Sequence, residues 1–233
     1  MPTSSQWLTI NSPDGPFQAY LALPHGGRGG PGIVLLQEIF GVNEHIRAVA
    51  DQYAADGYVV LAPDLFWRQG PRIELGYADA DWQRAVALMN ACDVALARAD
   101  IALAAAALRA RPGVGANIAA LGFCFGGRLS FLAACDGVVD AAVAYYGGGI
   151  HNCLEQAARL AVPLQLHFGA EDSHIPAAAV KNIAERFAAN EDVEIHLYPQ
   201  AEHGFNCDHR AGYQQRAAAQ AHGNSLLFLA ERL

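Results

Sequence analysis

The segment Gly122-Phe-Cys-Phe-Gly-Gly127 constrains the fold more than any other part of the chain. It follows an apolar run, residues 117–122, and precedes a helix-like segment, residues 128–134. A strand, a tight turn and a helix in this order place the thiol of Cys124 at a helix N-terminus, where backbone N–H groups favour negative charge. A Cβ atom on Gly122 or Gly126 would crowd such a turn. The motif therefore predicts a cysteine nucleophile, with an ordinary small core residue as the alternative.

Two later segments carry polar residues in loops that directly follow predicted strands. The first runs from Pro163 into Gly169 and ends at Asp172, and the second is the strand 193–198, whose following loop contains His203. Such loops gather at the carboxyl edge of a parallel sheet, where open α/β folds have their active sites. The order nucleophile, acid, histidine is that of α/β-hydrolases. Glu171 is the alternative acid, but the Gly-x-x-Asp spacing favours Asp172.

Strand and helix signals alternate along most of the chain. We expect strands at residues 7–10, 17–23, 32–37, 58–62, 117–122, 141–146, 163–169 and 193–198, and helices at 43–56, 79–109 (one bent helix or two), 128–134, 177–189 and 212–233. This alternation predicts an α/β fold: a mostly parallel, twisted sheet with helices on both faces. We expect a single domain over residues 1–233, because this length and a hydrophobic content of 53% suit one large core.

Charge and composition exclude several classes of function. A formal net charge of -8 argues against a nucleic-acid-binding surface, and no apolar run is long enough to span a bilayer. The segment Met1–Trp7 lacks the basic and apolar regions of a secretory signal. Five cysteines without C-x-x-C spacing favour reduced thiols and a cytoplasmic location. The cluster His203, Cys207, Asp208 and His209 is a possible metal site, but it lacks recognisable zinc spacing, so we expect no metal.

With Cys124, Asp172 and His203 in this order, the chain resembles the dienelactone hydrolase (carboxymethylenebutenolidase) family of α/β-hydrolases. The resemblance extends over nearly the whole chain. Its most specific parts are Glu38-Ile-Phe-Gly-Val-Asn43, Pro63-Asp-Leu65, Gly122–Gly127, Tyr145-Tyr-Gly147, Gly169-Ala-Glu-Asp172 with Pro176, and His203-Gly-Phe205. It implies hydrolysis of a small ester or lactone through a covalent acyl-enzyme, without a metal or organic cofactor. We expect a monomer or a homodimer.

The resemblance also implies a role for Glu38, which follows the first buried strand. In the family the resting thiol interacts with this glutamate, and substrate binding shifts the cysteine toward the histidine. The alternative is that Glu38 only fixes the loop that follows it. The backbone N–H groups of Ile39 and Phe125 are the expected oxyanion donors, and such donors contribute about 3 kcal/mol each to transition-state stabilisation.

This sequence departs from the family where the substrate carboxylate is held. Family members acting on dienelactone use two arginines, but Trp82 and Cys207 occupy those positions here. Arg84 and Arg210 lie nearby and are candidate substitutes. Because an arginine fork depends on its orientation, this departure predicts a weaker grip on a carboxylate.

Aromatic residues are the remaining candidates for the substrate pocket. Phe40, Trp82 and Tyr145 are expected to line it, with core packing as the alternative for each. Two other functions stay open beside ester or lactone hydrolysis. One is thioester or other acyl hydrolysis on the same three residues, and the other is a non-catalytic ligand-binding protein.

Overall fold

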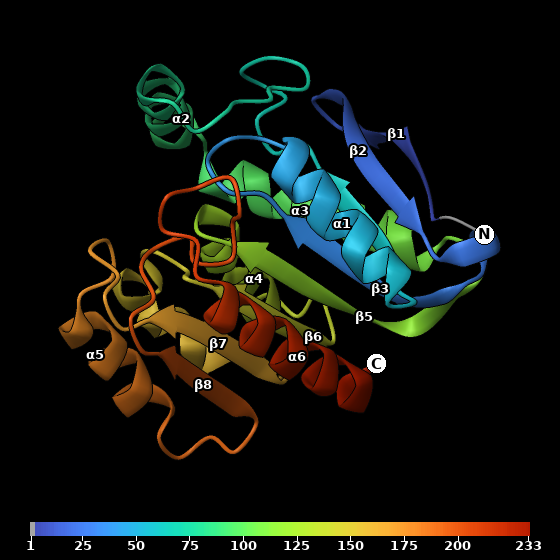
Figure 1. Ribbon diagram of the computed structural model, residues 1–233. Coiled ribbons are helices and arrows are strands. Elements are labelled where there is room, and N and C mark those ends of the chain that lie inside the picture. Colours follow the sequence, from blue (N-terminus) through green and yellow to red (C-terminus); the bar gives the residue numbers. More distant parts are fainter. Residues whose placement is uncertain (1–2) are drawn as a thin grey trace. The chain divides into compact units, whose positions relative to one another are not determined.

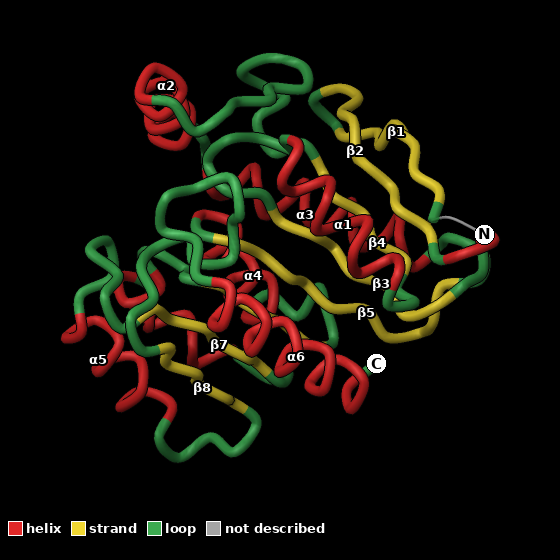
Figure 2. The backbone as a smooth tube through the Cα atoms, viewed as in Figure 1, coloured by secondary structure: helices red, strands yellow, loops and turns green. Residues whose placement is uncertain are grey.

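The structure is a computed structural model that describes residues 3–233 (Figures 1 and 2). Met1 and Pro2, which begin the segment expected not to be a secretory signal, lie outside the described residues. In chain order the elements are β1 (Ser4–Ser12), β2 (Gly15–Leu23), η1 (His25–Gly27), β3 (Gly30–Leu36), α1 (Glu44–Ala55), β4 (Val59–Pro63), α2 (Asp79–Ala91), α3 (Val94–Arg109), β5 (Val114–Phe123), α4 (Phe125–Cys135), β6 (Ala141–Tyr145), η2 (Ile150–Asn152), η3 (Leu154–Arg159), β7 (Leu164–Gly169), α5 (Ala177–Phe187), β8 (Val193–Tyr198) and α6 (Gln215–Arg232). The predicted alternation of strands and helices is confirmed.

The chain forms two compact units. The first ends at Ala119 and also includes Leu233, and the second comprises Ala120–Arg232. Strand β5 begins in the first unit and ends in the second. The expectation of one domain over the whole chain stays a prediction.

The first unit is built on the predicted N-terminal hairpin. Strands β1 and β2 pair antiparallel, with Ser4 opposite Leu23 and Ser12 opposite Gly15. Strand β2 also pairs antiparallel with β4, which pairs parallel with β3 on its other side. Helix α1 packs on β2 and β4, and α3 packs on β1, β3 and β4.

Helix boundaries in the first unit follow from capping residues. The side chain of Asn43 accepts a hydrogen bond from the Ile46 N–H and caps α1, as predicted. The tract predicted at residues 79–109 is two helices, because Asp93 caps the second one by accepting bonds from the N–H groups of Ala95 and Leu96. An extended residue with a capping carboxylate begins a new helix rather than bending an old one.

The second unit contains three parallel strands in the order β6, β7, β8. Helix α4 packs on β6. Helix α6 covers the face of β7 that carries Gln165 and His167, because Gln165 bonds the Asn224 carbonyl and His167 bonds Ser225. His167 also bonds the Tyr198 hydroxyl at 2.8 Å. The strand predicted as an apolar run thus contains a buried polar network.

Among residues 3–233, no helix combines the length and apolar character needed to cross a membrane.

Candidate active site

Cys124 occupies a strained turn between β5 and α4. Its backbone angles, φ 54° and ψ −113°, lie outside the regions that L-residues ordinarily adopt. Its N–H donates to the Tyr145 carbonyl at 3.0 Å, which ties the turn to the end of β6. Its side chain is partly exposed, whereas the neighbouring Phe123 and Phe125 are buried. The turn therefore holds a reachable thiol in a fixed direction.

The glycines around Cys124 are required by close backbone contacts. A Cβ atom at Gly122 would lie 2.1 Å from the Gly126 carbonyl oxygen. A Cβ atom at Gly127 would lie 2.6 Å from the Tyr145 carbonyl oxygen. The predicted crowding at Gly122 is confirmed, and Gly127 is a second position where only glycine fits.

Asp172 lies in the loop after β7 and is buried. Its Oδ1 atom accepts hydrogen bonds from the N–H groups of His174 and Ile175, at 2.8 and 3.1 Å. These bonds leave Oδ2 to face another partner. The alternative acid, Glu171, is exposed instead. Of the two carboxylates, the buried one is therefore Asp172, the residue that the Gly-x-x-Asp spacing favours.

His203 is that partner. Its Nδ1–H donates to Asp172 Oδ2 at 2.7 Å, and its imidazole is also hydrogen-bonded to the Cys124 side chain. The loop after β7 can approach the loop after β8 because Gly169, the last residue of β7, has no side chain. A Cβ atom at Gly169 would lie 2.3 Å from the Ala201 carbonyl oxygen. The structure thus brings Cys124, His203 and Asp172 into one hydrogen-bonded chain.

Electrostatic interactions among these hydrogen-bonded side chains favour the charged forms of His203 and Asp172. Burial would lower the pKa of His203, but its charge interactions and hydrogen bonds with Cys124 and Asp172 raise the pKa to about 10. Burial would raise the pKa of Asp172, but the hydrogen bond and charge of His203 and the two backbone N–H donors lower it overall. A protonated imidazole between sulfur and carboxylate is the state that these shifts favour.

The N-terminus of α4 adds a further positive potential beside the thiol. Phe125 is the first residue of this helix, and its N–H belongs to the first turn. First-turn N–H groups have no carbonyl acceptor within their own helix and carry the positive end of the helix dipole. The position of Phe125 is therefore suited to an oxyanion donor.

Glu38 belongs to the first unit, where it is fully buried after β3. The amide nitrogen of Asn43 donates to the Tyr77 hydroxyl at 3.1 Å, so the proton of that hydroxyl is directed to Glu38 Oε2, also at 3.1 Å. The loop is held tightly, because a Cβ atom at Gly41 would lie 1.7 Å from the Ile73 carbonyl oxygen. Glu38 is therefore an oriented carboxylate, and its role toward Cys124 stays a prediction.

Four further predicted residues, Ile39, Phe40, Trp82 and Arg84, also belong to the first unit. Ile39 follows Glu38 and is buried. The ring of Phe40 contacts the rings of Tyr77 and Trp82, with centroid distances of 4.6 and 5.8 Å. Arg84 is exposed on α2, two residues beyond Trp82. Their roles toward a substrate stay predictions.

Residues of the loop after β8 differ sharply in exposure. Cys207, at one of the family's arginine positions, is fully buried. The guanidinium of Arg210 lies against the backbone of Gly204, because a Cβ atom there would lie 2.4 Å from Nη1. Asp208 and His209 are exposed side chains, with a separation of 3.8 Å between their charged atoms.

Tyr145 lies in the core of the second unit. It is 1% exposed, its hydroxyl bonds Ser225 at 2.8 Å, and its ring stacks on His167 at 4.5 Å. This favours packing, the alternative role, over lining an open pocket. Its neighbour Tyr146 instead contacts His203 edge-on at 5.1 Å.

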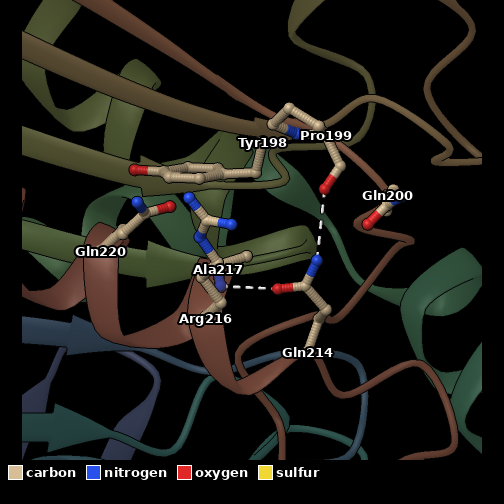
Figure 3. Close-up of a pocket in the computed structure, with 7 residues that line it drawn as sticks. All are labelled: Tyr198, Pro199, Gln200, Gln214, Arg216, Ala217 and Gln220. Carbon is tan, nitrogen blue, oxygen red and sulfur yellow. Dashed lines mark hydrogen bonds between the residues drawn. The ribbon is translucent and has the colours of Figure 1, made fainter.

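A separate hollow of about 220 Å³ lies where β8 and its following loop meet the start of α6 (Figure 3). Gln214 crosses it, since its amide nitrogen bonds the Pro199 carbonyl and its Oε1 atom accepts from the Ala217 N–H. Arg216 and Tyr198 both line the hollow. No predicted site residue lines this hollow.

Comparison with known proteins decides the family. The model of the "Dienelactone hydrolase family" matches residues 17–233. The chain belongs to the dienelactone hydrolase family. Carboxymethylenebutenolidase of Pseudomonas putida is 35% identical over 228 residues, covering 97% of this chain and 96% of that protein. Carboxymethylenebutenolidase of Pseudomonas sp. (strain P51) is 36% identical over 217 residues, covering 92% and 90%.

A solved structure shows the same relationship. A Klebsiella pneumoniae protein provisionally described as a dienelactone hydrolase superposes with a TM-score of 0.87, at 33% identity and 99% coverage of both chains. The predicted α/β-hydrolase fold is confirmed. The protein is a dienelactone hydrolase-like enzyme, in the class of carboxylic ester hydrolases.

Sequence reasoning did not single out three residues that contact the candidate site residues: Tyr77, which bonds Glu38, and Tyr146 and His174, whose rings contact His203. Tyr146 ends the predicted strand 141–146 and belongs to the segment Tyr145-Tyr-Gly147, and this position was an available signal; in the structure it directly follows β6. His174 follows the predicted acid by two residues. Tyr77 had no signal, because 39 positions separate it from the glutamate that it bonds.

Proposed function

We propose that the protein hydrolyses small esters or lactones with Cys124 as the nucleophile, through a covalent acyl-enzyme. The hydrogen-bonded chain from Cys124 through His203 to Asp172 supports this proposal. Asp172 holds the imidazole orientation, because its second oxygen is fixed by two backbone N–H groups. No metal or organic cofactor takes part.

In the acylation step His203 takes the proton of the Cys124 thiol, and the Cys124 sulfur attacks the ester carbonyl carbon. The carbonyl oxygen becomes an anion, stabilised by the N–H groups of Phe125 and Ile39. The intermediate then expels the alkoxide, which takes a proton from His203, and leaves a thioester on Cys124. In a lactone the released hydroxyl remains attached to the acyl group.

The deacylation step uses the same groups in reverse order. Water gives a proton to His203 and its oxygen attacks the thioester carbonyl. Collapse of the second intermediate breaks the carbon–sulfur bond, releases the acid and restores Cys124 and His203 to their starting state. Glu38 modulates the resting state of Cys124 and is not the orienting acid.

Replacing Cys124 by alanine tests this proposal. We expect hydrolysis of 4-nitrophenyl butyrate to fall by at least about 10³-fold, because removal of a nucleophile leaves only oxyanion stabilisation and binding. Cys92→Ala is the matched control, since Cys92 is another partly exposed thiol. Mass spectrometry of the quenched wild-type reaction should find one acyl group on Cys124. Full turnover by Cys124→Ala would refute the assignment.

The substrate class follows from the departure at the family's arginine positions. Trp82 and Cys207 cannot form a bidentate contact with a carboxylate, and Cys207 is buried. We therefore propose that uncharged short-chain aryl esters are hydrolysed and that lactones bearing a carboxylate are only modestly preferred. A panel of matched oxoesters and thioesters separates this activity from thioester hydrolysis.

We further propose a cytoplasmic protein, monomeric or homodimeric, without a nucleic-acid or membrane partner. The five cysteines are free thiols in the structure, as suits a reducing compartment. Size-exclusion chromatography with light scattering tests the oligomeric state.

A further inference from the structure

His174 is the accessible aromatic neighbour of the proposed general base. Its ring meets the His203 ring edge-on, with centroids 4.8 Å apart and planes at 74°. The Tyr146 ring also contacts His203, but Tyr146 is fully buried, whereas His174 is exposed. A ligand at His203 can therefore reach His174.

The position of His174 is fixed by the same turn that fixes the acid. Its N–H donates to Asp172 Oδ1 at 2.8 Å, and the next N–H along the chain, that of Ile175, donates to the same atom. The backbone of His174 therefore cannot move without moving Asp172. This gives the ring a defined place beside the catalytic histidine.

Arg210 brings a permanent positive charge to the same region. Its guanidinium lies on the backbone of Gly204, the residue after His203, and Gly204 accommodates it because it has no side chain and a φ of 78°. The charge of Arg210 also acts on His174. A guanidinium and an imidazole thus accompany His203.

Three charged groups among residues 3–233 that act on His174 are His203, Asp172 and Arg210. Burial contributes most to lowering the pKa of His174, and the positive charges of His203 and Arg210 lower it further, while Asp172 opposes them. These interactions together favour the neutral form of the His174 imidazole. An anion bound among these positive groups would offset their repulsion and favour the imidazolium.

We infer that His174 is a specificity-determining residue: together with Arg210 it binds an anionic group of the substrate beside His203, and its protonation makes the choice between anionic and neutral esters depend on pH. This inference rests on the proposed function. The proton comes from solvent when the anion binds. Because binding and protonation are linked, selectivity for the anionic substrate should increase as pH falls.

The test compares two aryl esters with the same leaving group, mono-4-nitrophenyl glutarate and 4-nitrophenyl butyrate. The ratio of their kcat/KM values removes any pH dependence that comes from the shared chemical step, because both reactions use the same leaving group and the same proposed catalytic residues. We expect this ratio in the wild-type enzyme to rise as pH falls from mildly alkaline to mildly acidic, by up to about tenfold per pH unit where His174 titrates. A ratio that does not change with pH would overturn the inference.

Variants assign the effect to His174. His174→Gln removes the titration, and His174→Phe keeps a ring against His203 without a charge, so both should give a ratio independent of pH. Arg210→Gln should lower the ratio at every pH. His25→Gln, which removes an exposed histidine of the first unit, should leave the wild-type pH dependence in place. Retention of that dependence in both His174 variants would refute the inference.

A binding measurement is independent of turnover. Histidine NMR of the wild-type enzyme with glutarate should show a rise in the pKa of His174, and butanol at the same concentration should produce none. An unchanged pKa with saturating glutarate would contradict the inference. The Cys124→Ala variant separates the two levels: if it hydrolyses both esters the proposed function fails, and if it is inactive while His174 variants keep the wild-type ratio, only this inference fails.

Discussion

At the scale of single residues, Glu38 shows how the first unit orients a buried carboxylate. The Asn43 side chain both caps α1 through Oδ1 and donates through its amide nitrogen to Tyr77, so its orientation is fixed from two sides. Because the Tyr77 hydroxyl oxygen accepts this bond, its own O–H group donates to the Glu38 carboxylate. The sequence placed Glu38 correctly after a buried strand, but it contained no sign of this relay.

The relay gives a test of the role of Glu38. We expect Glu38→Gln and Tyr77→Phe each to change the pH dependence of iodoacetamide reaction at Cys124, because both alter the carboxylate proposed to act on the thiol. Tyr58→Phe is the matched control, a buried tyrosine elsewhere in the first unit. Alkylation is followed by mass spectrometry in the substrate-free enzyme. Identical profiles and unchanged catalysis in both variants would reduce Glu38 to a loop-fixing residue.

At the scale of elements, the turn between β5 and α4 was predictable because its requirement is steric. The motif indicated strand, turn and helix, and the structure has them in that order with Cys124 at a positive φ. The predicted helix began at residue 128, whereas α4 begins at Phe125. The difference arises because Gly126 and Gly127 have low helix propensity, yet close packing of the helix start on β6 outweighs it.

Gly122→Ala tests the steric requirement of this turn. The added Cβ atom would lie 2.1 Å from the Gly126 carbonyl oxygen, a backbone atom that cannot move without displacing the start of α4. We expect a loss of unfolding free energy of at least about 3 kcal/mol, of the size seen for severe overpacking. Urea unfolding measures it. Gly137→Ala, where the structure places no atom within 4 Å of the new Cβ but φ is 68°, is a control for backbone strain alone. Equal losses in both variants would contradict the steric account.

Capping residues explain why the tract 79–109 divides. Asp93 caps α3 with two hydrogen bonds, whereas Ala78, the corresponding residue of α2, has an extended backbone and no capping side chain. We expect Asp93→Ala to lower the free energy of unfolding by about 1 kcal/mol, and Ala78→Ser to raise it by about 0.5–1 kcal/mol. Thermal unfolding of both variants checks the pair. A stabilising Asp93→Ala variant would be incompatible with this account.

At the scale of the whole molecule, the sequence specified the order of elements and the order of the three site residues. Both depend on local signals: apolar runs, caps, glycines and the loop positions after strands. It did not specify Tyr77, Tyr146 or the buried polar network around His167, because these contacts join residues far apart in the chain or hide within a run that reads as apolar. Side-chain roles at Phe40, Trp82 and Arg84 remain predictions for the same reason.

The charged pair of His203 and Asp172 should also affect the stability of the molecule as a function of pH. The pKa of His203 is raised from an ordinary value near 6.5 to about 10, so its stabilising contribution is fully present below pH about 6.5 and is lost as pH rises through about 10. Asp172 is ionised in the folded and unfolded states over this whole window, because its pKa is lowered from an already acidic value. Asp172 itself therefore takes up no proton between these pH values, and its effect on stability in this window acts through His203.

Asp172→Asn removes one of the two charges that raise the pKa of His203. The variant should lose unfolding free energy relative to wild type, and this loss should be largest near pH 6 and shrink as pH approaches 10, since both proteins then contain a neutral imidazole. Urea unfolding at intervals of pH across this window measures the difference. Asp208→Asn is the matched control, because it removes the same charge from an exposed residue of the loop that contains His203. Its loss of unfolding free energy should not depend on pH in this way. A difference that grows with pH would mean that His203 is neutral in the folded enzyme, and the hydrogen-bonded chain would then have to act without its imidazolium.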